Sequence, residues 1–255
     1  MMIYHLDLCS GIGTFAESAQ RNIRNYELEA LCESDEYCQE QLRYNFNAPI
    51  EPDVRTIDLL RYAHVNLITA GFPCQDISIA NNNAKGIHGE NSGLWFDIAK
   101  IITYIRPRYV VLENSSMLVQ RGLTSILVHL ASIGYALEWR TLRAEQFGYP
   151  HRRKRLFVFC ANTDGIGLEE IHFFHRTITE ELCKTEDEAH SRLAGKFSGL
   201  AGVGFFRDDY PKFCEVDNGY THQENAAELH ALGNSIIPEC CDVYMRAINT
   251  IEGVM

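Results

Sequence analysis

A cysteine with the setting of a nucleophile follows an apolar stretch of this 255-residue chain. Cys74 stands in the turn Gly71-Phe72-Pro73-Cys74-Gln75, directly after the predicted strand 65–73. Backbone amides of a turn that precedes a helix favour the thiolate, which is the nucleophilic form of cysteine. A lone cysteine is more often a buried structural residue, so this turn by itself leaves both roles open.

An acid and a pair of arginines stand beside two other predicted strands. Glu113 follows four apolar or aromatic residues and is either a solvated strand end or a functional acid. His151, Arg153 and Arg155 precede the apolar stretch LFVFC. Alternate residues of an extended segment point the same way, so both guanidiniums would share a face. They could bind a phosphate or a pyrimidine carbonyl, although most such runs are solvated surface.

A glycine turn follows the first predicted strand, 3–8, and precedes an amphipathic helix. Gly11 and Gly13 would let a ligand approach the backbone, and the helix N-terminus favours anionic groups. Glu33 ends the second predicted strand about 20 residues later, where an acid commonly holds ribose hydroxyls. A Gly-x-Gly turn alone is also ordinary turn chemistry, but together these features favour an adenosine-containing cofactor.

The elements that must position these residues alternate along residues 1–160. Strand, turn and helix repeat in an order that predicts an α/β fold with a doubly wound, mostly parallel, Rossmann-like sheet. Carboxyl ends of parallel strands meet at one edge, so the glycines, Glu33, Cys74 and Glu113 should gather there. The strands are expected at 3–8, 26–33, 65–73 and 108–114 and in the stretches YALEWRTL and RLFVFC.

The composition and the apolar pattern of the sequence change after Cys160. Residues 161–225 are rich in Gly, Asp, Glu and Asn and have no sustained apolar period. We therefore predict a catalytic, cofactor-binding domain at 1–160, a small irregular inserted recognition region at 161–225, and a C-terminal segment, 226–255, that returns to the sheet. The loop Gly233-Asn234-Ser235-Ile236-Ile237-Pro238 in that segment is either a simple connection or a cofactor contact.

The amino-acid composition excludes several classes of protein. Hydrophobic residues make up 46% of the chain, which excludes general disorder, and no apolar run approaches the length of a membrane span. The start of the chain does not resemble a secretory signal, and nine scattered cysteines without a CxxC pair favour reduced thiols in a cytoplasmic compartment. We expect no membrane contact.

Charge is distributed unevenly along the chain. The net charge of -11 argues against a generic nucleic-acid binder. Six basic residues nevertheless fall within positions 140–155, whereas acids gather at 169–188. A molecule with one basic cleft and an acidic exterior fits both observations.

The ordered motifs DLCSGIGTF, GFPCQDIS, ENS, HRRKR and LGNSIIP closely resemble those of the cytosine-5 DNA methyltransferase family. The resemblance runs from residue 3 to about 160 and from about 226 to 250. It implies a class I methyltransferase fold, S-adenosyl-L-methionine as cofactor, no metal, and double-stranded DNA as the partner. It further implies methyl transfer to carbon 5 of a flipped-out cytosine.

The resemblance also assigns roles to individual positions. It implies Cys74 as the nucleophile, Glu113 as the catalytic acid, and Arg153 and Arg155 as paired arginines. The cofactor-binding residues that it implies are Cys9, Ser10, Gly11, Ile12, Gly13, Thr14, Glu33, Asp53, Val54, Pro73, Leu94, Asn234 and Ser235.

Three positions depart from the family pattern. Cys9 replaces the usual Phe, which removes an aromatic neighbour of the adenine; Ser115 replaces Val and His151 replaces Gln. None of these changes removes a catalytic group. The recognition region between the arginine motif and Gly233 is short for the family.

Three alternative functions fit parts of the sequence less completely. A tRNA cytosine-5 methyltransferase would share the same motifs, and a catalytically weak homologue acting as a DNA-binding regulator would fit Cys9 and the short insertion. A dinucleotide-dependent oxidoreductase would give the Pro-Cys-Gln turn no role. We expect a monomer in the cytoplasm of a bacterial, archaeal or virus-infected cell, and the motifs neither require nor exclude a partner restriction endonuclease.

Overall fold

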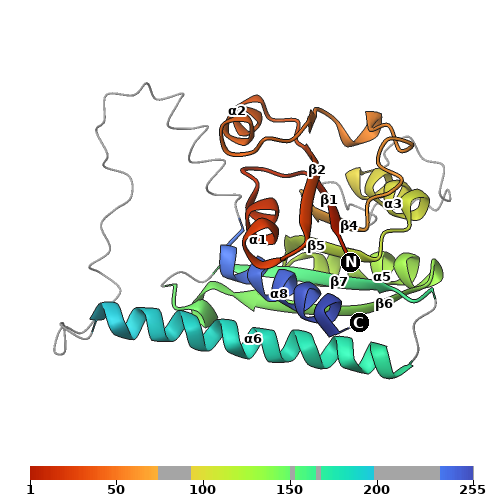
Figure 1. The fold of residues 1–255 in the computed structure, drawn as a ribbon. Helices are drawn as coiled ribbons and strands as arrows, with labels where there is room; N and C mark the ends of the chain where they lie inside the picture. Colours follow the sequence, from red (N-terminus) through yellow and green to blue (C-terminus); the bar gives the residue numbers. More distant parts are fainter. Residues whose placement is uncertain (74–92, 150–152, 165–167, 198–235, 255) are drawn as a thin grey trace, which may run out of the picture.

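The computed structural model describes residues 1–73, 93–149, 153–164, 168–197 and 236–254 (Figure 1). Its centre is a seven-stranded sheet with the order β3-β2-β1-β4-β5-β7-β6. The first five strands in this order are parallel, and β7 is antiparallel to both β5 and β6. The predicted doubly wound, mostly parallel sheet is confirmed. The strands are β1 Ile3–Leu8, β2 Tyr26–Cys32, β3 Ile50–Glu51, β4 Leu67–Gly71, β5 Tyr109–Ser115, β6 Tyr135–Arg143 and β7 Lys154–Asn162.

Helices cover both faces of the sheet because its central strands are apolar on both sides. In β5, Val110 and Leu112 join the core on the side of α3 and α5, whereas Val111 joins the core on the side of α1, α6 and α8. The helices are α1 Thr14–Asn22, α2 Glu36–Asn45, α3 Leu94–Ile105, α4 Leu118–Arg121, α5 Leu123–Ser132, α6 Leu168–Phe197 and α8 Pro238–Val254, with 3-10 turns η1 Val54–Thr56 and η3 Ala144–Phe147. None of the helices in the described ranges combines the length and apolar character that a membrane span requires.

The expectation of an irregular segment after Cys160 is wrong for residues 168–197. They form α6, a 30-residue helix that runs along the sheet (Figure 1). Its inward face does follow helical spacing, but polar residues occupy several of the buried positions, which hides the apolar period. The buried residues of α6 are Phe174, Thr177, Ile178, Glu181, Thr185 and Ala189. Of the rest of the predicted recognition region, residues 161–162 end β7, and residues 165–167 and 198–225 lie outside the described residues.

Candidate active site

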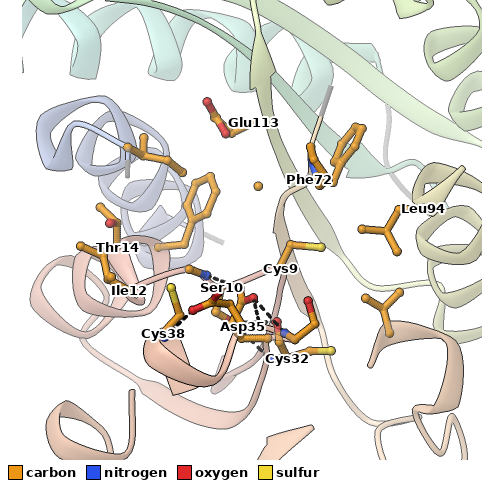
Figure 2. A pocket seen from close by; sticks show the side chains of 18 of the residues that line it. Cys9, Ser10, Ile12, Thr14, Cys32, Asp35, Cys38, Phe72, Leu94 and Glu113 are labelled. Carbon is orange, nitrogen blue, oxygen red and sulfur yellow. Dashed lines mark hydrogen bonds between the residues drawn. The ribbon is translucent and has the colours of Figure 1, made fainter. Parts of the chain in front are cut away.

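A cavity of about 610 Å³ opens at the carboxyl edge of the sheet. The loop after β1 and the ends of β2, β4 and β5 line it, and Arg155 at the start of β7 closes one side. Figure 2 shows Glu113 at one end, Cys32, Asp35 and Cys38 at the other, and Cys9 and Ser10 between them. The strand ends therefore meet as the sequence predicted.

The glycine loop is held in left-handed backbone conformations. Cys9, Gly11 and Gly13 have φ angles of 52°, 55° and 87°. The Ser10 hydroxyl donates to the backbone oxygen of Asp7 at 2.8 Å, which fastens the loop to the end of β1. Gly13 does not line the cavity but caps α1, and a Cβ there would overlap the ring of Phe46. Cys9, Ser10, Gly11, Ile12 and Thr14 do line the cavity.

Backbone amides orient the carboxylate of Glu33. The Gly11 amide donates to its Oε2 at 2.7 Å, and the amides of Ser34 and Asp35 donate to its Oε1 at 2.8 and 2.9 Å. These three bonds join the glycine loop to the start of α2. Oε2 keeps one acceptor site for a ligand hydroxyl, because an ionised carboxylate offers about four such sites and the three amides use one on Oε2 and two on Oε1.

Asp53 is fixed in a similar way at the adjoining wall. Its Oδ1 accepts bonds from the backbone amide and from Nε of Arg55, both at 2.9 Å. These bonds hold the pKa of Asp53 below its usual value, so the group is an anion at neutral pH. Val54 follows and is buried, and Pro73 and Leu94 also line the cavity.

Glu113 is buried at the other end of the cavity and faces Arg155. Arg155 Nε lies 2.9 Å from Glu113 Oε1 as an ion pair, but the N–H does not have hydrogen-bond alignment with that oxygen. Burial raises the pKa of Glu113 to about 7, and the positive charges of Arg155 and Arg153 oppose the rise. The carboxyl group can therefore give or take a proton near neutral pH.

Asn114 fixes the turn that leads to Cys74. Its side-chain amide donates to the backbone oxygen of Phe72 at 2.8 Å, across from β5 to the end of β4. A Cβ added to Gly71 would lie 3.5 Å from Glu113 Oε2, so the chain enters the turn beside the acid. Cys74 itself lies outside the described residues.

The remaining predicted site residues divide into two groups. Arg153 contributes charge near Glu113 but is not among the residues that line the cavity. His151, Asn234 and Ser235 lie outside the described residues, although Ile236, which follows the last two, does line the cavity.

Sequence reasoning missed a buried polar chain beneath the glycine loop. His5 contacts the Tyr26 hydroxyl at 2.8 Å and the Thr69 hydroxyl at 2.7 Å, and Thr69 donates to Asp7. Burial lowers the pKa of His5 to about 3 and raises that of Asp7 to about 7. The sequence did contain a signal for this polar chain. His5 and Asp7 are two residues apart in an apolar strand and therefore point to the same face.

Comparison with known proteins identifies relatives of the chain. The family model for C-5 cytosine-specific DNA methylase matches residues 3–200. The type II methyltransferase M2.ScrFI of Lactococcus lactis subsp. cremoris is 36% identical over 132 residues, covering 49% of this chain and 35% of the relative. The type II methyltransferase M.CviJI of Paramecium bursaria Chlorella virus IL3A is 34% identical over 213 residues, covering 82% of this chain and 50% of the relative.

A solved structure agrees at the level of the fold. A mutant of DNMT2 from Spodoptera frugiperda has a TM-score of 0.55 at 14% identity, covering 65% of this chain and 52% of that chain. The chain thus spans half or less of the length of the two curated relatives described above.

Proposed function

The chain belongs to the C-5 cytosine-specific DNA methylase family, and from that premise we propose that it is a DNA (cytosine-5-)-methyltransferase that uses S-adenosylmethionine. One observation carries the proposal. A single cavity joins a buried acid and arginine, Glu113 and Arg155, to the fixed carboxylates of Glu33 and Asp53. Such a cavity suits a nucleobase at one end and an adenosine at the other.

The cofactor end fits an adenosine with a charged tail. Glu33 would accept a bond from a ribose hydroxyl, since its three backbone bonds leave one acceptor site on Oε2. Asp53 and Val54 would contact the adenine, and Leu94 and Pro73 would form apolar walls. The glycine loop and the N-terminus of α1 favour the carboxylate of a methionine group, and Asn234 and Ser235 are proposed to contact the same group. When bound, S-adenosylmethionine supplies an electrophilic methyl group.

The base end fits a cytosine ring. In its protonated form the Glu113 carboxyl can donate to ring nitrogen 3 while its other oxygen accepts from the exocyclic amine. Arg155 would bind the ring carbonyl, with Arg153 adding positive charge nearby. Protonation of the ring prevents negative charge from building up on it, which makes carbon 6 more electrophilic.

Cys74 is proposed as the nucleophile. Its thiolate would form a bond to carbon 6, and the electron pair of the 5,6 double bond would make carbon 5 nucleophilic. After carbon 5 gains the methyl group, loss of its proton to a base and departure of the Cys74 thiolate would restore the aromatic ring. A cytosine inside a duplex cannot reach such a cavity, so the nucleotide must be flipped out.

Substitution of Cys74 tests the proposal. We expect Cys74→Ser and Cys74→Ala to abolish methyl transfer from tritiated cofactor to duplex DNA. Cys183→Ser is the matched control, because Cys183 is an exposed thiol on α6 and should leave the rate unchanged. Methyl transfer at the wild-type rate by Cys74→Ala would contradict the covalent mechanism.

A trapping experiment adds an independent readout. Fluorine at carbon 5 blocks the final proton loss, so wild-type protein should form a denaturation-resistant complex with 5-fluorocytosine DNA. A parallel incubation with tRNA tests the alternative substrate. If the tRNA becomes labelled and the DNA does not, the DNA methyltransferase assignment is rejected. Bisulfite sequencing of a co-expressed plasmid would then identify the methylated sites.

A further inference from the structure

The exposed face of the edge strand β6 carries a row of side chains that the proposed chemistry does not use. Even-numbered residues of β6 face α6: Glu138 pairs with His175 at 2.7 Å, and Arg140 donates to the Thr179 hydroxyl at 2.6 Å. Odd-numbered residues therefore face the opposite side of the sheet. On that side Leu137 packs against the core beneath α5, whereas Trp139 is 45% exposed.

Two cations continue this row at the carboxyl edge of the sheet. Arg143 and Lys154 are directly opposed across the β6–β7 ladder, and both are exposed. Opposed residues of an antiparallel pair point to the same face, with Cβ atoms about 5 Å apart, and like charges there are destabilising. Among the described residues neither side chain forms an ion pair with a carboxylate. We name Trp139, Thr141, Arg143 and Lys154 the β6 strip.

The β6 strip begins at the same carboxyl edge of the sheet as the candidate active site. Lys154 and Arg155 are adjacent in β7 and point to opposite faces: Lys154 lies on the side of α5, whereas the Arg155 guanidinium, which contacts Glu113 in the cavity, lies on the side of α8. From Lys154 and Arg143 the strip extends along β6 to Trp139, a length of roughly 13 Å for residues four apart in a strand. Successive phosphates of one DNA strand rise about 3.4 Å along the helix axis, so the strip can span several of them.

We propose that the β6 strip binds the phosphate backbone of the DNA that flanks the flipped cytosine. Arg143 and Lys154 contact phosphates, and Trp139 contacts a neighbouring sugar or base through its exposed ring. Charge complementarity favours this partner. The protein has a net charge of -11, yet these two adjacent cations have no carboxylate partner in the described part of the chain. Exposed aromatics interspersed with cations are the composition of nucleic-acid-binding surfaces. The inference rests on the proposed function, which supplies the DNA.

The salt dependence of binding tests the two cations. Each phosphate contact contributes about -0.9 to the slope of log K against log salt. We expect the double variant Arg143→Gln/Lys154→Gln to reduce the magnitude of the slope by about 2 and to weaken binding roughly ten- to hundredfold near 0.1 M salt. The control is Arg24→Gln/Lys100→Gln, which removes two exposed cations that do not line the cavity and should leave the slope unchanged.

Tryptophan fluorescence tests the aromatic end. The chain has two tryptophans, and Trp95 is buried. Quenching by acrylamide therefore reports mainly on Trp139, and the variant Trp139→Phe shows how much of the fluorescence comes from Trp139. Saturating duplex DNA should protect Trp139 from the quencher. Protection that appears without DNA and rises with protein concentration would instead indicate a contact between copies and would overturn the inference.

The possible failures are distinguishable. If wild-type protein methylates DNA while the double variant matches the control in slope and affinity, the β6 strip is rejected and the proposed function stands. If the double variant loses slope and DNA shields Trp139, but no methyl transfer occurs, the strip is supported and the proposed activity is rejected.

Discussion

Glu33 and Glu113 line the same cavity at the ends of β2 and β5, two strands that β1 and β4 separate in the sheet, yet they are held in different ways. Three backbone amides bond the carboxylate of Glu33, which is half-buried at the end of β2. Glu113 is buried in β5 and has an arginine beside it but no aligned donor on Oε1. Figure 2 shows Glu113 at one end of the cavity and Asp35, a near neighbour of Glu33 in sequence, at the other.

In the proposed function, this difference separates ligand binding by Glu33 from proton transfer by Glu113. Backbone donors fix the direction of the Glu33 carboxylate, which suits a group that must only accept hydrogen bonds from a ligand. Burial moves the pKa of Glu113 to about 7, which suits a group that must carry a proton during the reaction. We therefore propose that one residue type serves two purposes because its surroundings differ.

Removing the proton chemistry should have the largest effect. We expect Glu113→Gln to reduce kcat by about two to four orders of magnitude, the usual contribution of acid–base catalysis. The measurement is single-turnover methyl transfer with saturating cofactor and DNA. An unchanged kcat would mean that Glu113 only shapes the cavity.

The pH dependence of stability provides the control for this variant. The folded pKa of Glu113 is about 7, above its ordinary value of 4.5, so the folded state binds the proton more tightly than the unfolded state. Its contribution to stability is full below about pH 4.5 and is lost as the pH rises toward 7. Urea unfolding at several pH values should show a smaller decline over this window in Glu113→Gln than in wild type.

Distorting the backbone at the cofactor end should have the next largest effect. Gly13→Ala places a Cβ at a φ of 87° against the ring of Phe46, which should cost about 2–4 kcal/mol of unfolding free energy. Chemical denaturation measures it. Gly253→Ala is the matched control, because a Cβ there meets nothing within 4 Å; equal stabilities of the two variants would contradict the packing argument.

Replacing Glu33 should weaken cofactor binding while leaving the chemistry intact. The Nε2 group of Glu33→Gln cannot accept bonds from the backbone amides, and losing charge-assisted bonds costs about 1.5–3 kcal/mol. The KM for the cofactor should therefore rise roughly ten- to hundredfold at nearly constant kcat. A fall in kcat without a change in KM would reverse the roles assigned to the two glutamates.

The smallest effect is expected at the turn between the two ends. Asn114→Ala removes the hydrogen bond to the Phe72 carbonyl, which should cost about 1 kcal/mol. If the bond positions Cys74, kcat should fall about fivefold while cofactor affinity is unchanged. If Asn114→Ala loses the expected stability but keeps the wild-type kcat, the role of Asn114 is structural only.

Six of the seven strands were accessible from the sequence because the period of apolar residues is a local property, whereas β3, with only two residues, was not predicted. Residues 3–8 and 109–115 are apolar stretches of strand length bounded by polar or glycine-containing turns. Their parallel pairing then required the glycine loop, Glu33 and Glu113 to share an edge, and the structure agrees. The helix α6 was not accessible, since Thr177, Glu181 and Thr185 fill buried positions of its inner face.

What the sequence alone determined is the α/β class and the set of reactive residue types, because both follow from local pattern and from motif identity. What only the tertiary structure decided is the state of those residues. The pKa of Glu113, the three backbone bonds to Glu33 and the like-charged pair of Arg143 and Lys154 arise from burial and strand register. Burial and strand register bring together residues that are far apart in the chain. No short stretch of the sequence therefore contains all the residues that set these properties.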